Sequence, residues 1–159
     1  MRKINLNEIP EGSWTSPKGV YGGASKEISV ALGRDANAAE SKNRHPFDAE
    51  LCRLPPGKKA CPFHSHSAQW EYYHVLSGRG LIRTSEGMMR LEVGDICLFP
   101  PDEPHQLIND GSADLVVYII ANNPTGESCH YPDSNKWLVP SPTRKIIRSD
   151  NIEYYDGEE

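Results

Sequence analysis

Two histidines spaced two residues apart, with a glutamate and a third histidine farther along, constrain the fold more than any other feature of the sequence. His64 and His66 leave the same face of a β-strand, because side chains alternate between the two faces. Glu71 follows after a gap short enough for a tight turn, and His105 can arrive from another strand. Three imidazoles and one carboxylate suit a divalent transition metal, because imidazole binds Zn, Cu, Fe and Ni and a carboxylate extends the range towards Mn.

The residues around this set form two spaced motifs. The fixed positions of the first motif are Gly57, His64, His66, Glu71 and Gly78. Those of the second are Gly94, Pro100, Asp102, His105 and Asn109. Both closely resemble the signature motifs of the cupin superfamily, G-x5/6-H-x-H-x3/4-E-x6-G and G-x5-P-x-G-x2-H-x3-N, in that order. Asp102 departs from the usual Gly, and because Asp tolerates left-handed turn geometry better than most residues we expect the turn to be kept.

The resemblance implies an all-β, single-domain jelly roll, a double-stranded β-helix barrel with extensions at both ends. It implies a barrel core at residues 47–121, an N-terminal extension at 1–46 that packs on the barrel, and a C-terminal extension at 122–159. The flanks resemble those of small single-cupin proteins, some of which are labelled sugar-phosphate-isomerase-like. A length of 159 residues fits one domain with a sizeable core.

The distribution of turn-forming residues independently predicts a β-rich protein. Thirteen glycines and thirteen prolines separate short apolar runs, and no segment shows sustained helical periodicity. A jelly roll protects the edges of so many short strands. Hairpin turns are expected at 85–87 and 110–112. The expected strands are 27–32, 49–54, 61–66, 71–76, 79–84, 88–92, 96–99, 105–109 and 115–120.

Composition limits the partners. A net charge of −5 argues against a nucleic-acid or anionic-membrane partner, since either would favour a basic patch. The first seven residues lack the apolar region of a secretory signal, and the longest apolar run, 115–121, is too short to span a bilayer as a helix. We therefore expect a soluble, cytoplasmic protein. The four cysteines form no C-x-x-C pair and are interpreted as small buried residues, with none assigned as a ligand.

Several residues beside the predicted ligands admit two interpretations. Tyr73 shares a strand face with Glu71, so it is either a pocket wall with a useful hydroxyl or an aromatic core residue. Glu71 and Tyr73 are the candidate catalytic residues. Gln69 and Trp70 occupy the turn before Glu71 and either rim the pocket or face solvent. His74 lies on the opposite face, where surface or subunit contact is the better interpretation.

Two classes of function fit a site of His64, His66, Glu71 and His105 that holds Fe²⁺, Mn²⁺, Zn²⁺ or Ni²⁺. The first is a metal-dependent enzyme acting on a small sugar, sugar phosphate or carboxylic acid, and the resemblance implies isomerase, decarboxylase or dioxygenase chemistry. The second is a non-catalytic, metal-dependent protein that binds or senses a small ligand. Cupins of this type commonly pair through β-sheets, which implies a homodimer. Its expected contact residues on the outward face are Tyr72, His74 and Leu76.

Overall fold

The computed structural model describes residues 1–35, 44–139, 144–148 and 150–158. The strands are β1 (Gly12–Thr15), β2 (Gly22–Glu27), β3 (Phe47–Leu54), β4 (Ser65–His66), β5 (Glu71–Ser77), β6 (Gly80–Thr84), β7 (Gly87–Leu91), β8 (Ile96–Phe99), β9 (Gln106–Ile108), β10 (Leu115–Asn122), β11 (Cys129–Tyr131), β12 (Lys136–Val139) and β13 (Lys145–Arg148). The helices are short: η1 (Leu6–Glu8), α1 (Ile28–Ala31) and η2 (Pro132–Ser134). The all-β class is confirmed.

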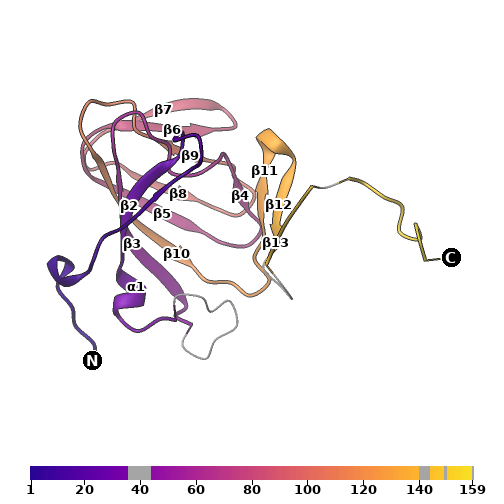
Figure 1. The fold of residues 1–159 in the computed structure, drawn as a ribbon, viewed down its shortest axis with the longest axis horizontal. Helices are drawn as coiled ribbons and strands as arrows, with labels where there is room; N and C mark the ends of the chain where they lie inside the picture. The colour runs from indigo at the N-terminus through magenta and orange to yellow at the C-terminus, as the bar shows by residue number, and fades with distance from the viewer. Residues whose placement is uncertain (36–43, 140–143, 149, 159) are drawn as a thin grey trace.

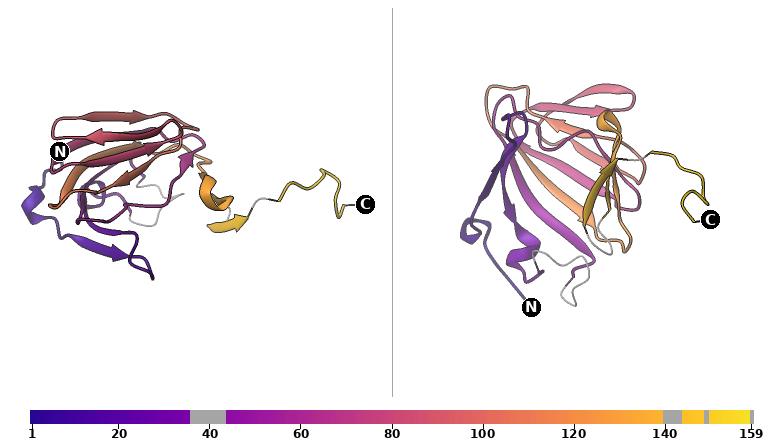
Figure 2. Two further views of the ribbon diagram at one scale, coloured as in Figure 1. Left: turned by 90° about the horizontal axis from the view of Figure 1, so that it is seen from above. Right: turned by 45° about the vertical axis from the view of Figure 1, so that its right-hand side comes forward.

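The described residues form three antiparallel sheets (Figure 1). The largest has the order β1-β2-β3-β10-β5-β8, and a second has the order β7-β6-β9. These two sheets face each other and enclose the core of a jelly roll. A third sheet, with the order β13-β12-β11-β4, stands beside the barrel and joins it through β4. Figure 2 shows the described end of the chain leading away from this third sheet.

Alternation along the strands explains the core. On β10 the residues Leu115, Val117 and Ile119 are buried, and the residues between them are partly exposed. Their neighbours across the ladders, Cys52 and Val75, point the same way. Ile82, Leu91 and Leu107 close the core from the smaller sheet, as residues of its cluster. The core therefore fills the barrel beneath the histidine motifs.

The expected strand at 27–32 is wrong. β2 ends at Glu27, and residues 28–31 turn into α1, which packs on β3. Ser29 is buried there and its hydroxyl oxygen accepts a hydrogen bond from the Ala49 backbone N–H at 2.9 Å. Gly33 has φ +98° directly after the helix, a conformation that glycine adopts without strain. The alternating apolar residues of this segment therefore pack as one helical turn.

Two turn regions differ in outcome. The predicted hairpin near 85–87 is confirmed, since β6 and β7 pair around residues 85 and 86. The predicted hairpin at 110–112 is wrong, because this segment connects β9 in one sheet to β10 in another.

Asp102 has φ 66°, so the left-handed turn expected at that position is confirmed. The expected strand at 61–66 is shorter than predicted, since only Ser65–His66 pairs as β4.

The sequence predicted no strand after residue 120, but the described residues there form β11, β12 and β13. β11 and β12 form a hairpin, and β11 pairs with β4 so that Cys129 lies opposite His66. Arg83 on β6 donates to Asp133 at 2.6 and 2.8 Å and holds the turn of this hairpin against the barrel. Among the described residues, no helix has the length and apolar character needed to cross a bilayer.

Candidate metal centre

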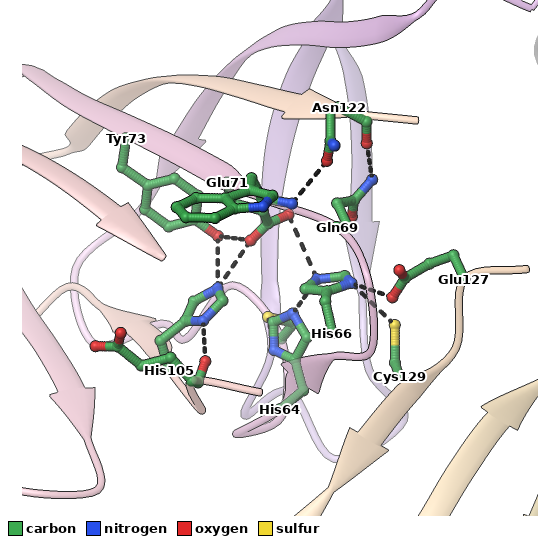
Figure 3. A network of polar contacts seen from close by, with 12 residues as sticks. His64, His66, Gln69, Glu71, Tyr73, His105, Asn122, Glu127 and Cys129 are labelled. Atoms are coloured by element: carbon green, nitrogen blue, oxygen red, sulfur yellow. Dashed lines mark hydrogen bonds and ion pairs between the residues drawn. The ribbon is translucent and has the colours of Figure 1, made fainter. Parts of the chain in front are cut away.

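The structure brings the four predicted ligand residues together inside the barrel (Figure 3). His66 lies on β4, Glu71 begins β5, and His64 and His105 face each other across an isolated β-bridge. The Nε2 atoms of His64 and His66 are 3.1 Å apart. Glu71 Oε2 is 2.8 Å from His105 Nε2, and Glu71 Oε1 is 3.6 Å from His66 Nε2. All three histidines are buried, with His105 only 1% exposed.

Each histidine is oriented by an acceptor on its other ring nitrogen. His64 Nδ1 donates to the Pro62 carbonyl at 3.0 Å, and His105 Nδ1 donates to the Glu103 carbonyl at 3.1 Å. A carbonyl oxygen can only accept, so the proton of each neutral ring is on Nδ1. When the rings are neutral, as metal binding requires, their Nε2 lone pairs are therefore directed into the cluster. This is the arrangement that metal-binding histidines require, and the residues fit a divalent metal.

Donor atoms of His64, His66 and Glu71 lie within 4.8 Å of one another, and His105 joins them through its contact with Glu71. The described residues therefore include a His/Glu group that is able to hold a metal ion. Imidazole nitrogens with one carboxylate suit Fe²⁺, Mn²⁺, Zn²⁺ and Ni²⁺ alike, and the donor types do not select among them.

The pKa values of Glu71, His64 and His66 are shifted in different directions by their surroundings. Burial alone would raise the pKa of Glu71, but the His105 hydrogen bond and the nearby imidazoles outweigh burial and lower that pKa to about 2. Burial, then the neighbouring charge of His105, lowers the pKa of His64 to about 4. For His66 the lowering effect of burial is outweighed by its hydrogen-bond partners and by the charge of Glu71, so its pKa rises to about 10. The site thus holds an ionised carboxylate, a neutral His64 and a protonated His66 at neutral pH.

Tyr73 combines the two interpretations that its sequence position allowed. Tyr73 is 6% exposed and belongs to the core cluster, where its ring packs edge-on against Phe99. Its hydroxyl donates to Glu71 Oε2 at 2.9 Å and lies 3.4 Å from His105 Nε2. Burial, and then the charge of Glu71, raises the Tyr73 pKa, so the phenol keeps its proton and holds the carboxylate in place.

Sequence reasoning missed two residues at this site, both from the segment after residue 122. Glu127 Oε1 accepts a hydrogen bond from His66 Nδ1 at 2.9 Å. Cys129 Sγ lies 3.4 Å from the same nitrogen. Figure 3 shows His66 between Glu71 on one side and these two residues on the other. Neither belongs to a motif, and the pairing of β11 with β4 gives no signal in the sequence.

A third missed residue, Glu50, is a carboxyl group on β3. Glu50 pairs with Ile119, which in turn pairs with Tyr73, so it faces the barrel interior. Burial, followed by the charge of Glu27, raises the pKa of Glu50 to about 8. The barrel therefore holds a neutral carboxyl group beside the ionised Glu71.

The remaining candidates lie at the margins of the site. Gln69 and Trp70 are both tied to Asn122, at 2.6 Å each, and Trp70 is 45% exposed. His74 is partly exposed on the outward face of β5, beside Ile96 and Tyr118 in the neighbouring strands. All four cysteines are free, with Cys52 and Cys129 buried.

Comparison with known proteins agrees with this geometry. The family model described as "Cupin domain" matches residues 50–121. An oxalate-binding protein from Thermotoga maritima is 32% identical over 63 residues, which cover 40% of this chain and 51% of that protein. An uncharacterised protein from Methanocaldococcus jannaschii is 33% identical over 64 residues, 40% of this chain and 50% of that protein. The matches thus span about half the length of these two relatives.

Solved structures extend the likeness in fold beyond the matched domain. A sugar phosphate isomerase of the cupin superfamily from Silicibacter pomeroyi superposes with a TM-score of 0.79 at 23% identity, covering 94% of each chain. A protein from Thermotoga maritima predicted to be an oxalate decarboxylase gives a TM-score of 0.59 at 18% identity, covering 76% of this chain and 98% of that one. Because the family match, the motif spacing and the jelly-roll barrel agree, residues 50–121 of this chain form a cupin domain.

Proposed function

We propose that this protein is a metal-dependent enzyme for a small oxygenated organic molecule, with a divalent metal held by His64, His66, Glu71 and His105. The observation that carries the proposal is the common orientation of the three imidazoles. Each has Nδ1 hydrogen-bonded to an oxygen, and the Nε2 atoms converge on the Glu71 carboxylate. The division into a core at 47–121 with extensions at 1–46 and 122–159 is part of this proposal.

The proposed substrate class follows from the chemistry of the divalent metal that the site would hold. A bound divalent metal supplies Lewis acidity, which favours ligands with carboxylate, carbonyl or enediol oxygens. A relative that binds oxalate and a structural neighbour described as a sugar phosphate isomerase both support oxygen-rich small molecules. A sugar, a sugar phosphate or a small carboxylic acid is the proposed ligand class.

Two residues of the chain are proposed to handle protons. Glu71 is ionised and Tyr73 is a protonated phenol, and the two share a 2.9 Å hydrogen bond. The Glu71 carboxylate can accept a proton, and the Tyr73 hydroxyl, which donates to Oε2, holds the carboxylate in position for this transfer. Tyr73 is buried and the Glu71 side chain is 12% exposed, so little water reaches this pair.

A second candidate function is non-catalytic binding of a small ligand at the same metal. The named activity of the Thermotoga maritima relative, oxalate binding, favours it. Turnover distinguishes the two candidate functions. An enzyme converts its ligand, whereas a binding protein is stabilised by a ligand that it leaves unchanged. A ligand at about one hundred times its dissociation constant adds roughly 2.7 kcal/mol to the free energy of unfolding.

Metal analysis of protein purified without an affinity tag tests the proposal. Wild type is expected to carry one divalent metal per chain, and His66→Ala and His105→Ala to lose most of it while remaining folded. His74→Ala is the matched control, because His74 lies on the outward face of β5. Stoichiometric metal in both site variants would refute the ligand assignment. Thermal shift with oxalate and with a sugar phosphate then identifies the ligand class.

A further inference from the structure

The carboxylate of Glu127 is held rigidly at the outer side of His66. Its Oε1 accepts from His66 Nδ1 at 2.9 Å and from the Ser67 backbone N–H at 3.2 Å. Its Oε2 accepts from the Ala68 backbone N–H at 2.9 Å. The same turn of chain that carries His66 therefore also positions the acceptor for its ring. Two backbone donors prevent the carboxylate from rotating away.

The three histidines differ in what holds Nδ1. For His64 and His105 the acceptor is a backbone carbonyl two residues earlier in the chain, so each loop orients its own ring. For His66 the acceptor is a charged side chain 61 residues later, outside the matched cupin domain. An anionic hydrogen-bond acceptor on Nδ1 makes the opposite ring nitrogen, Nε2, a stronger metal ligand than a carbonyl acceptor does.

We infer that Glu127 is a positioning residue that fixes the tautomer and orientation of His66, so that the segment after the cupin domain sets the metal affinity of the site. This inference rests on the proposed function, because it assigns His66 Nε2 to the metal. Glu127 faces Nδ1, on the opposite side of the ring from Glu71 (Figure 3). It therefore acts through His66.

The experiment measures Co²⁺ and Zn²⁺ affinity by competition with a chelator for wild type, Glu127→Gln and Glu127→Ala. An amide at position 127 keeps one acceptor for His66, but its NH₂ group then opposes a backbone N–H. Glu127→Gln is expected to weaken binding about 10-fold and Glu127→Ala about 100-fold, the range typical of lost partners of metal-binding histidines. The Co²⁺ absorption spectrum should change in Glu127→Ala, which a merely structural role would not produce.

Asp133→Asn is the matched control, because it removes the Arg83 contact of the same hairpin without touching His66. Circular dichroism of the metal-free variants shows whether each is folded. Wild-type affinity in both Glu127 variants, or an equal loss in Asp133→Asn, would overturn the inference and leave the proposed function standing. A wild type that binds no metal would overturn both. Two ions per wild-type chain, falling to one in Glu127→Gln, would make Glu127 a ligand and overturn the positioning role.

Discussion

His66 has an acidic partner on each ring nitrogen, and this determines how the metal-free protein responds to pH. Its pKa is raised to about 10, above the ordinary value near 6.5. The contacts of the protonated ring therefore stabilise the fold fully below about pH 6.5, and this stabilisation is lost as the pH rises through about 10. At neutral pH, His66 must lose that proton before Nε2 can bind a metal.

We predict that metal binding at pH 7 releases at least one proton per chain, because His66 is protonated there and must lose its proton to bind through Nε2. Calorimetry in buffers with different heats of ionisation measures this number directly. Binding that releases no proton would contradict the assignment of His66 as a ligand.

Some residues of the candidate site could be predicted from the sequence, and others could not. His64, His66, Glu71 and His105 are conspicuous because strand alternation and fixed spacing connect them along the sequence. Glu127 meets His66 only because β11 pairs with β4, and no local pattern records a contact between positions 61 residues apart. Burial likewise decides the unusual pKa of Glu50, and burial depends on the complete barrel.

At the scale of elements, the hairpin of β11 and β12 is held to the barrel by Arg83 and Asp133. The two side chains are 31% and 54% exposed, so solvent screens their attraction. We predict that Asp133→Asn lowers the free energy of unfolding by less than about 1 kcal/mol. Amide hydrogen exchange in β11 and β12 should nevertheless become faster. A loss above about 2 kcal/mol would show that this hairpin supports the whole fold.

The sequence predicted most strands of the barrel because its turns are marked by glycine and proline. It failed where local pattern and tertiary context disagree. Residues 28–31 alternate like a strand, but β3 offers them a helix-packing surface through Ser29. β11, β12 and β13 are short and lack long apolar runs, and each is held by pairing with its neighbour in the order β13-β12-β11-β4. Such pairing depends on the neighbouring strands, so the sequence pattern of a single strand does not reveal it.

At the scale of the whole molecule, the large sheet presents an apolar outer face at its β8 edge. Ile96 is 59% exposed, Leu98 is 56% exposed, and Leu76 on the adjoining strand is 43% exposed. Apolar side chains gathered at a sheet edge favour association. We predict a homodimer through this face, with a light-scattering mass near twice 17.7 kDa.

Ile96→Lys should weaken this dimer roughly 10-fold or more, because a buried branched side chain is worth about 1.5–3 kcal/mol. Met88→Lys is the control, because Met88 is 56% exposed on β7 in the other sheet. A wild-type mass of 17.7 kDa at micromolar concentration would contradict the predicted dimer.

The place of β10 in the large sheet also decides when the protein can assemble on the ribosome. β10 lies between β3 and β5, so the pair β2-β3 and the pair β5-β8 remain separate until residue 122 has been synthesised. All three motif histidines and Glu71 precede residue 122 in the sequence, so they are synthesised before the strand that completes the sheet. We therefore expect that an ion held by this proposed set is acquired only after the barrel has closed. Metal binding would then follow translation. A chain released before β10 is complete would contain all four proposed metal-binding residues but would lack the folded site.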